Sequence, residues 1–226
     1  MKLLSLNIRQ GGGPRIAAIC DYLVAQNCDA IVITEFRNNS SGDQLKVILA
    51  QAGFCYYHHN RTAPLQNTVM VATKLPSTPI TINLPTNEWS LVGADWEGIQ
   101  LVGGYFPQRK DKAGVFDSLE AMAHHNLLAV GDFNTGSNEL DAEGVDFYCA
   151  DQFEHLANQT LTDLWRAHNG QQTLEFSWYS HIGNGFRIDH ALAGKEAAAR
   201  CVTSYYDHSP RNSLTDHSAL IIELQP

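Results

Sequence analysis

The chain has 226 residues, of which 44% are hydrophobic and 17% charged, as in ordinary soluble globular proteins. Its 24 acidic residues outnumber its 15 basic ones, and the formal net charge of −9 argues against a protein that coats nucleic acid through its overall charge. Its five cysteines are scattered and include no Cys-x-x-Cys pair, so neither a disulfide framework nor a zinc–thiolate site is expected. The apolar start, residues 1–6, is too short for a signal sequence or a membrane span, which favours a cytoplasmic protein.

In chain order, apolar runs and turn residues predict many short strands and few helices. Helices are expected at residues 14–26, 44–52 and 116–125. The first nine strands or short elements are expected at residues 2–8, 29–34, 69–73, 80–84, 89–95, 99–105, 127–130, 161–166 and 176–179, and the last three at 187–192, 201–206 and 218–224. We find no linker and no repeat, and therefore expect one domain, residues 1–226, of the α/β class with sheets packed on each other.

The segment LAVGDFNTG, residues 128–136, is the most informative stretch of the sequence. Its apolar start predicts a buried strand, and Gly131 and Gly136 permit the tight backbone that follows. Residues two apart in an extended segment point the same way, so Asp132 and Asn134 would face one common space. Taken alone, an Asx turn explains this pattern better than a functional site does.

Other strands also begin or end with polar side chains of the kind found in active sites. The positions concerned are Asn7, Arg9, Glu35, Tyr105, Asp132, Asn134, Asp189 and the Asp216–His217 pair. Carboxylates and amides are hard oxygen ligands that suit Mg²⁺ or Mn²⁺, and a His beside an Asp can supply an oriented imidazole. A shared location in the fold would make these residues an active site.

Seven motifs occur in a fixed order between residues 7 and 217: Asn7, Glu35, the Tyr105-Phe106-Pro107-Gln108 segment, Gly131-Asp132-Phe133-Asn134, Ser177-Trp178, Arg187-Ile188-Asp189 and Thr215-Asp216-His217. This set resembles the endonuclease/exonuclease/phosphatase superfamily, and within it the exonuclease III-like apurinic/apyrimidinic endonucleases. The resemblance implies a four-layer α/β sandwich, in which two facing mixed β-sheets are flanked by helices. It also implies phosphoester cleavage that depends on a divalent cation, Mg²⁺ or Mn²⁺.

The resemblance further implies a role for each matching residue. Glu35 would be the main metal ligand, with Asn7 and Asp216 nearby, and Asp132 would activate or orient the attacking water.

Four other residues would act around the phosphate. Asn134 and Tyr105 would hold it, His217 would bind a phosphoryl oxygen or act as a base, and Asp189 would fix the tautomer of His217. In-line attack on a phosphodiester needs a cation, a positioned water and donors for the nonbridging oxygens, which this set supplies.

Contacts to a substrate are expected from Arg9, Arg109, Trp178 and Arg187. Arg9 stands where exonuclease III-like enzymes tend to have a small polar or acidic residue, which puts an additional metal ligand there in doubt. Nine of the fifteen basic residues fall in or beside loops that would surround the site, and they could form a basic rim for phosphates, although charged residues also populate loops for solubility alone.

Three Asp-His dipeptides compete for the catalytic role. Only Asp216–His217 leads directly into a long apolar strand, so His217 is assigned as catalytic, His190 as a strand neighbour and His208 as a loop residue.

The leading hypothesis is a monomeric DNA nuclease that acts on duplex DNA at abasic sites or 3′ ends. Two alternatives remain open: a phosphatase or phosphodiesterase for a small molecule or lipid headgroup, favoured by the acidic charge, and a catalytically silent binding module of the same fold.

Overall fold

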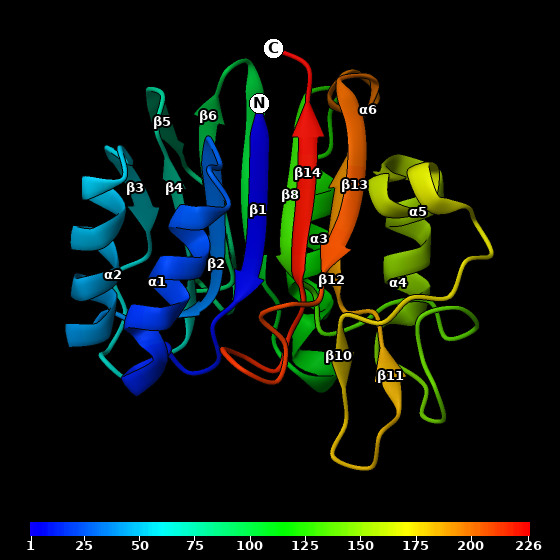
Figure 1. Cartoon of the computed structure of the whole chain (residues 1–226). Coiled ribbons are helices and arrows are strands. Elements are labelled where there is room, and N and C mark those ends of the chain that lie inside the picture. The colour runs from blue at the N-terminus through cyan, green and yellow to red at the C-terminus, as the bar shows by residue number, and fades with distance from the viewer.

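Two six-stranded sheets face each other across an apolar core and carry helices on their outer sides (Figure 1). The computed structural model describes all residues, 1–226. Both sheets are mixed, because β1–β2 and β7–β8 pair in parallel and the other neighbours pair antiparallel. The predicted four-layer α/β sandwich is therefore confirmed.

The strands follow a different order in space than in sequence. The first sheet runs β13 (Cys201–Asp207), β14 (Ala219–Leu224), β1 (Lys2–Asn7), β2 (Ala30–Phe36), β4 (Thr68–Thr73) and β3 (Tyr56–His59). The second sheet runs β5 (Ser77–Ile80), β6 (Leu91–Trp96), β7 (Ile99–Tyr105), β8 (Leu127–Asp132), β12 (Asp189–Ala193) and β9 (Thr162–Asp163). A separate hairpin, β10 (Trp178–Tyr179) and β11 (Gly185–Phe186), projects from the lower end of the molecule in Figure 1.

Helices cover the outer face of each sheet. The α-helices are α1 (Ile16–Ala25), α2 (Ser40–Gln51), α3 (Ala113–Ala121), α4 (Ala150–His155), α5 (Leu164–Asn169) and α6 (Lys195–Ala199). Shorter helical turns are η1 (Gly13–Arg15), η2 (Arg109–Lys112) and η3 (Leu156–Thr160). None of the helices has the length and apolar character that crossing a bilayer requires.

Alternation along the strands produces three apolar layers. Leu3 and Val32 point into the core between the sheets, whereas Leu4 and Ile33 pack against α1 and α2. On the other sheet, Ala129 and its neighbours pack against α3 and α4. The two sheets are thereby held at a fixed distance, which fixes how far apart the side chains at their ends lie.

The strand predicted at residues 80–84 is wrong in its bounds. β5 instead ends at Ile80, and the chain continues to β6 without regular pairing. Pro79 is tolerated there because β5 is the edge strand of its sheet.

Candidate active site

Asp132, Asp189 and His217 lie together at the end of the sandwich where the two sheets open. Asp132 ends β8 and stands opposite Asp189, the first residue of β12, in the antiparallel register. Nδ1 of His217 lies 2.8 Å from Oδ2 of Asp189, and one side-chain atom from each residue of the three falls within 4.8 Å of the others. All three side chains are buried. The hydrogen bond fixes the imidazole with its Nε2 side free for the site, as in other His–carboxylate pairs.

Asn7 connects the two sheets at this point. It ends β1 in the first sheet, is fully buried, and its Nδ2 donates to Oδ2 of Asp132 at 2.9 Å and to Oε1 of Glu35 at 3.2 Å. Its Oδ1 accepts the backbone N–H of Arg9 at 2.8 Å, which fixes the amide in this orientation. Asn7 therefore aligns two carboxylates that come from different sheets.

A β-bulge places Glu35 in the site. The pairing of β2 with β4 shifts between Thr34 and Phe36, and Glu35 has a φ of 53°. Such a bulge turns a side chain out of the regular alternation. Here it directs the Glu35 carboxylate to Asn7. The Oε2 atom of Glu35 accepts hydrogen bonds from the backbone N–H of Gln10 at 2.6 Å and from the side-chain amide of Asn67.

Asn67 is a site residue that the sequence did not predict. Its Nδ2 donates to Oε2 of Glu35 at 2.8 Å and lies 3.5 Å from the hydroxyl oxygen of Tyr105. Its Oδ1 accepts from Nε of Arg37 at 2.6 Å. The sequence signal for Asn67 is its position directly before the buried strand β4.

Tyr105 and Asn134 flank Asp132. Burial, with the negative charges of Glu35 and Asp132, raises the pKa of Tyr105, so its hydroxyl remains a donor. The backbone N–H of Asn134 donates to Oδ1 of Asp132 at 2.9 Å, and its Nδ2 donates to the carbonyl of Phe106 at 2.9 Å. The second Nδ2 hydrogen of Asn134 is available to a ligand.

Asp216 is the most exposed carboxylate of the site. Its carboxylate is 37% exposed and lies 3.7 Å from Nε of Arg9 and 3.4 Å from Nε1 of Trp178. Thr215 donates to the backbone carbonyl of Asn7 at 2.6 Å and thereby ties this loop to the end of β1. The predicted residues Arg9 and Trp178 thus lie at the mouth of the site.

The site concentrates negative charge in a buried space. Burial and the charge of Asp189 raise the pKa of Asp132 above its ordinary value. Burial alone would lower the pKa of His217, but the negative charges of Asp189, Asp132 and Asp216 raise it above its ordinary value, which favours the protonated ring.

The donor chemistry suits a divalent cation. Glu35, Asp132 and Asp216 offer carboxylate oxygens, the hard ligands that Mg²⁺ and Mn²⁺ take, and the NH2 group of Asn7 orients two of these carboxylates. The tightest cluster, Asp132 with Asp189 and His217, is less suited to hold the ion, because Asp189 and His217 are already bonded to each other.

The amino-acid sequence matches a known protein family. The model of the Endonuclease/Exonuclease/phosphatase family matches residues 4–217, nearly the whole chain. The chain belongs to this family. The predicted resemblance to the superfamily is thereby confirmed. No curated protein matches the chain.

Solved structures of other Endonuclease/Exonuclease/phosphatase proteins share the fold at low sequence identity. The 3′-5′ exonuclease NExo from Neisseria meningitidis superposes with a TM-score of 0.82 at 18% identity, and NExo from Neisseria, described as a 3′ phosphatase bound to product DNA hairpin, does so with 0.82 at 19%. An AP endonuclease from Archaeoglobus fulgidus gives 0.82 at 17%. In each case the whole of both chains is covered. These similarities establish the architecture.

Arg187 is the one predicted substrate-binding residue that the structure buries completely. Its side chain is fully buried, its Nε donates to Asp141 at 2.6 Å, and its guanidinium also donates to Asp163 at 2.6 Å. Arg166 pairs with the same Asp141. The prediction for Arg187 is therefore wrong, because its charge is used to fasten the loops beneath β12.

Arg109, His190 and His208 lie outside the cluster around Asp132. Arg109 is exposed on η2, directly after the Tyr105 segment, with no carboxylate within 4 Å. His190 is buried in β12 and His208 follows β13, and neither joins the cluster around Asp132.

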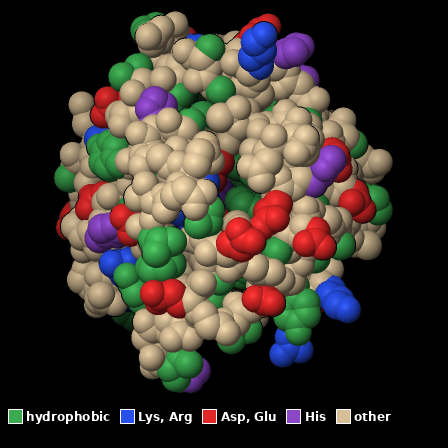
Figure 2. Space-filling model, turned by 90° about the vertical axis from the view of Figure 1, so that its right-hand side faces the viewer, with side chains coloured by type: hydrophobic (Ala, Val, Ile, Leu, Met, Phe, Trp, Pro, Cys, Tyr) green, Lys and Arg blue, Asp and Glu red, His purple; other side chains and the backbone are tan.

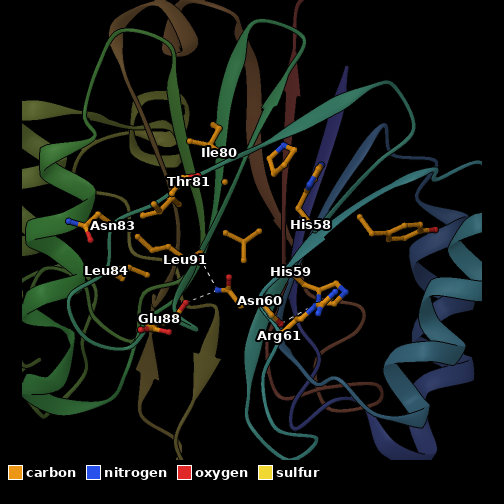
Figure 3. Close-up of a pocket in the computed structure, with 15 residues that line it drawn as sticks. His58, His59, Asn60, Arg61, Ile80, Thr81, Asn83, Leu84, Glu88 and Leu91 are labelled. Atoms are coloured by element: carbon orange, nitrogen blue, oxygen red, sulfur yellow. Dashed lines mark hydrogen bonds between the residues drawn. The ribbon is translucent and has the colours of Figure 1, made fainter.

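A large cavity lies away from these residues. It has a volume of about 760 Å³ and opens between the edge strands β3 and β5, where His58, Ile80 and Leu91 line it (Figure 3). It includes none of the carboxylates described above. The candidate active site is therefore separate from this cavity.

Proposed function

We propose that this chain is a divalent-metal-dependent phosphodiesterase that acts on DNA. The observation that supports this most strongly is the arrangement around Asp132, whose two oxygens are held by Asn7 and Asn134 while the Asp189–His217 pair lies opposite. Three kinds of group meet there: an oriented carboxylate, hydrogen-bond donors and a protonated imidazole. Such groups can orient a water and stabilise the charge that develops during hydrolysis of a phosphoester.

Each residue would have a separate part in the reaction. Glu35 and Asp216, with Asn7 between Glu35 and Asp132, would hold Mg²⁺ or Mn²⁺, which would neutralise charge on the phosphate oxygens. Asp132 would orient the attacking water and accept its proton.

Three donors would bind the nonbridging oxygens, where negative charge builds up during attack. These are the Tyr105 hydroxyl, the Asn134 amide and the His217 imidazolium. Because Asp189 keeps His217 protonated, we assign His217 as a donor to a phosphoryl oxygen in preference to a general base.

DNA is the proposed substrate class for two reasons. First, the structurally similar NExo and the Archaeoglobus protein are described as an exonuclease, a 3′ phosphatase with a DNA product and an AP endonuclease. Second, exposed basic side chains without an acidic partner stand on loops at the site end of the sheets, at Arg61, Arg109 and Lys110. Phosphate contacts of this kind supply most nucleic-acid affinity.

The face of the molecule that carries α4 and α5 would not contact DNA. Figure 2 shows the face that carries α4 and α5, on which Asp and Glu side chains (red) are more abundant than Lys and Arg side chains (blue). Exposed acidic residues on the segment before and at the start of α4 are Glu139, Glu143, Asp146 and Asp151. We therefore expect a small DNA footprint around the site, suited to an abasic site or a 3′ end.

A phosphatase or phosphodiesterase for a small phosphoester is the second candidate. The formal charge of −9 favours it, because an acidic body repels a long polyanion.

One panel of substrates distinguishes the two. Purified protein would be assayed with Mg²⁺ or Mn²⁺ on abasic duplex, recessed 3′ ends, 3′-phosphorylated ends, RNA and simple phosphoesters. We expect incision or 3′ processing of DNA that chelator abolishes and either ion restores, with the Asp132→Asn variant as an inactive control. Hydrolysis of small phosphoesters alone would favour the second candidate, and full activity in excess chelator would refute the metal-dependent mechanism.

A further inference from the structure

Lys112 is a buried cation that the mechanism above does not use. It ends η2, its residue is 1% exposed, and its Nζ donates to the backbone carbonyl of Asn134. No carboxylate lies within 4 Å of the ammonium group, so it forms no ion pair.

Placing an ammonium group there is energetically unfavourable. Burial is the main reason that the pKa of Lys112 falls to about 8, and the nearby charge of Asp132 opposes this shift. An unpaired buried charge is destabilising, whereas a Met or Leu could fill similar space without that penalty. A group of this kind beside a catalytic centre is a candidate for a functional role.

The partner of Lys112 is the residue that links Asp132 to the phosphate side of the site. Asn134 has a φ of 51°, a left-handed conformation that needs support from its surroundings. Its N–H is held by Asp132 and its side chain by the carbonyl of Phe106. Lys112 holds the third polar group of this residue, its carbonyl oxygen.

We propose that Lys112 is a positioning residue, which fixes Asn134 against Asp132 and places a buried positive charge behind the phosphate-binding side of the site. This inference rests on the proposed phosphoester hydrolysis. A fixed charge in a poorly hydrated region favours the extra negative charge of the transition state more than the ground state. The expected signature is therefore a fall in kcat with a smaller change in KM.

Three variants separate charge, hydrogen bond and fold. Lys112→Met removes both charge and donor, Lys112→Gln keeps a donor without the charge, and Lys195→Met makes the same chemical change at an exposed site on α6. Kinetics on a DNA substrate are measured together with thermal stability and with hydrogen exchange at the Asn134 amide.

We expect kcat to fall roughly 10- to 100-fold in both Lys112 variants, with KM within about threefold. Exchange at the Asn134 amide should accelerate in Lys112→Met, because Asn134 loses one of the three hydrogen bonds that hold it in place. Lys195→Met should behave as the wild type in each measurement.

Two results would overturn the inference: wild-type kcat in a folded Lys112→Met protein, or unchanged exchange at Asn134. A wild-type protein that hydrolyses no phosphoester would instead refute the proposed function, and the exchange measurement would still decide whether Lys112 positions Asn134.

Discussion

His217 differs from the other two histidines that follow an aspartate, because only its ring is bonded to a carboxylate inside the site. His208 instead contacts Ser218 at 2.8 Å on one side and Glu175 at 3.5 Å on the other, with its side chain 40% exposed. Replacing His217 by Ala removes a donor that acts in the transition state, so kcat on DNA should fall about 100-fold or more. His208→Ala should change it by less than about threefold. Equal losses would mean that the wrong Asp-His pair had been assigned.

The role of a single residue could be predicted where the residue belongs to a sequence motif. It could not be predicted where the role depends on partners that are distant in the sequence. The resemblance named Asp132, Asp189 and His217, and the structure brings them together. The burial of Arg187 depends on Asp141 and Asp163, which approach it only after the sheet has formed. Nothing local in the sequence distinguishes such an arginine from one that binds phosphate.

At the scale of elements, apolar runs were sufficient for strands buried on both faces. β1, β2 and β8 are of this kind, and their predicted ranges are close to the observed ones. β3 was missed because its four residues are only half-buried and carry no apolar run, and α4 because a six-residue helix has too few turns for a periodic pattern. Tertiary packing stabilises both elements.

The η2 segment offers a test of how the loops contact DNA. Arg109 and Lys110 are exposed, follow the Tyr105 segment directly and have no acidic partner. Reversing both charges to Glu should weaken DNA binding at least tenfold at low salt and reduce its salt dependence, because two phosphate contacts are lost. Hydrolysis of a small phosphodiester should fall much less. Binding measured by fluorescence anisotropy at several salt concentrations checks this, and unchanged DNA affinity would place the DNA on another surface.

At the scale of the whole molecule, the base of the site rests on buried ionic groups. Asp141 and Asp163 have lowered pKa values because Arg187 more than offsets their burial. Aspartates with a lowered pKa stabilise the fold at pH values above the ordinary pKa of an aspartate. This stabilisation is lost as the pH falls through their lowered pKa values. Removing one partner of such a cluster costs about 3–5 kcal/mol, because the other charges stay buried. The Asp163→Asn variant should therefore unfold at clearly lower urea concentration at pH 7.

His190, beside this cluster, should make the fold sensitive to milder acid. Its ring is fully buried, Nε2 bonds to the carbonyl of Thr135 at 2.7 Å, and burial with the charge of Arg187 lowers its pKa to about 4. The His190 ring takes up a proton near pH 6.5 in the unfolded chain but not in the folded chain. The contribution of His190 to the free energy of unfolding is therefore complete above pH 6.5 and is lost toward pH 4.

The raised pKa of Asp132 acts with the opposite sign in part of this pH range, so the informative quantity is the difference in unfolding free energy between wild type and His190→Gln. That difference in unfolding free energy should decrease by roughly 1.4 kcal/mol per pH unit as the pH falls from 6.5 to 4, whereas His168→Gln, at an exposed position, should show no such trend. Urea titrations at half-unit pH steps measure it, and parallel curves for wild type and His190→Gln would show that His190 does not titrate abnormally in the folded protein.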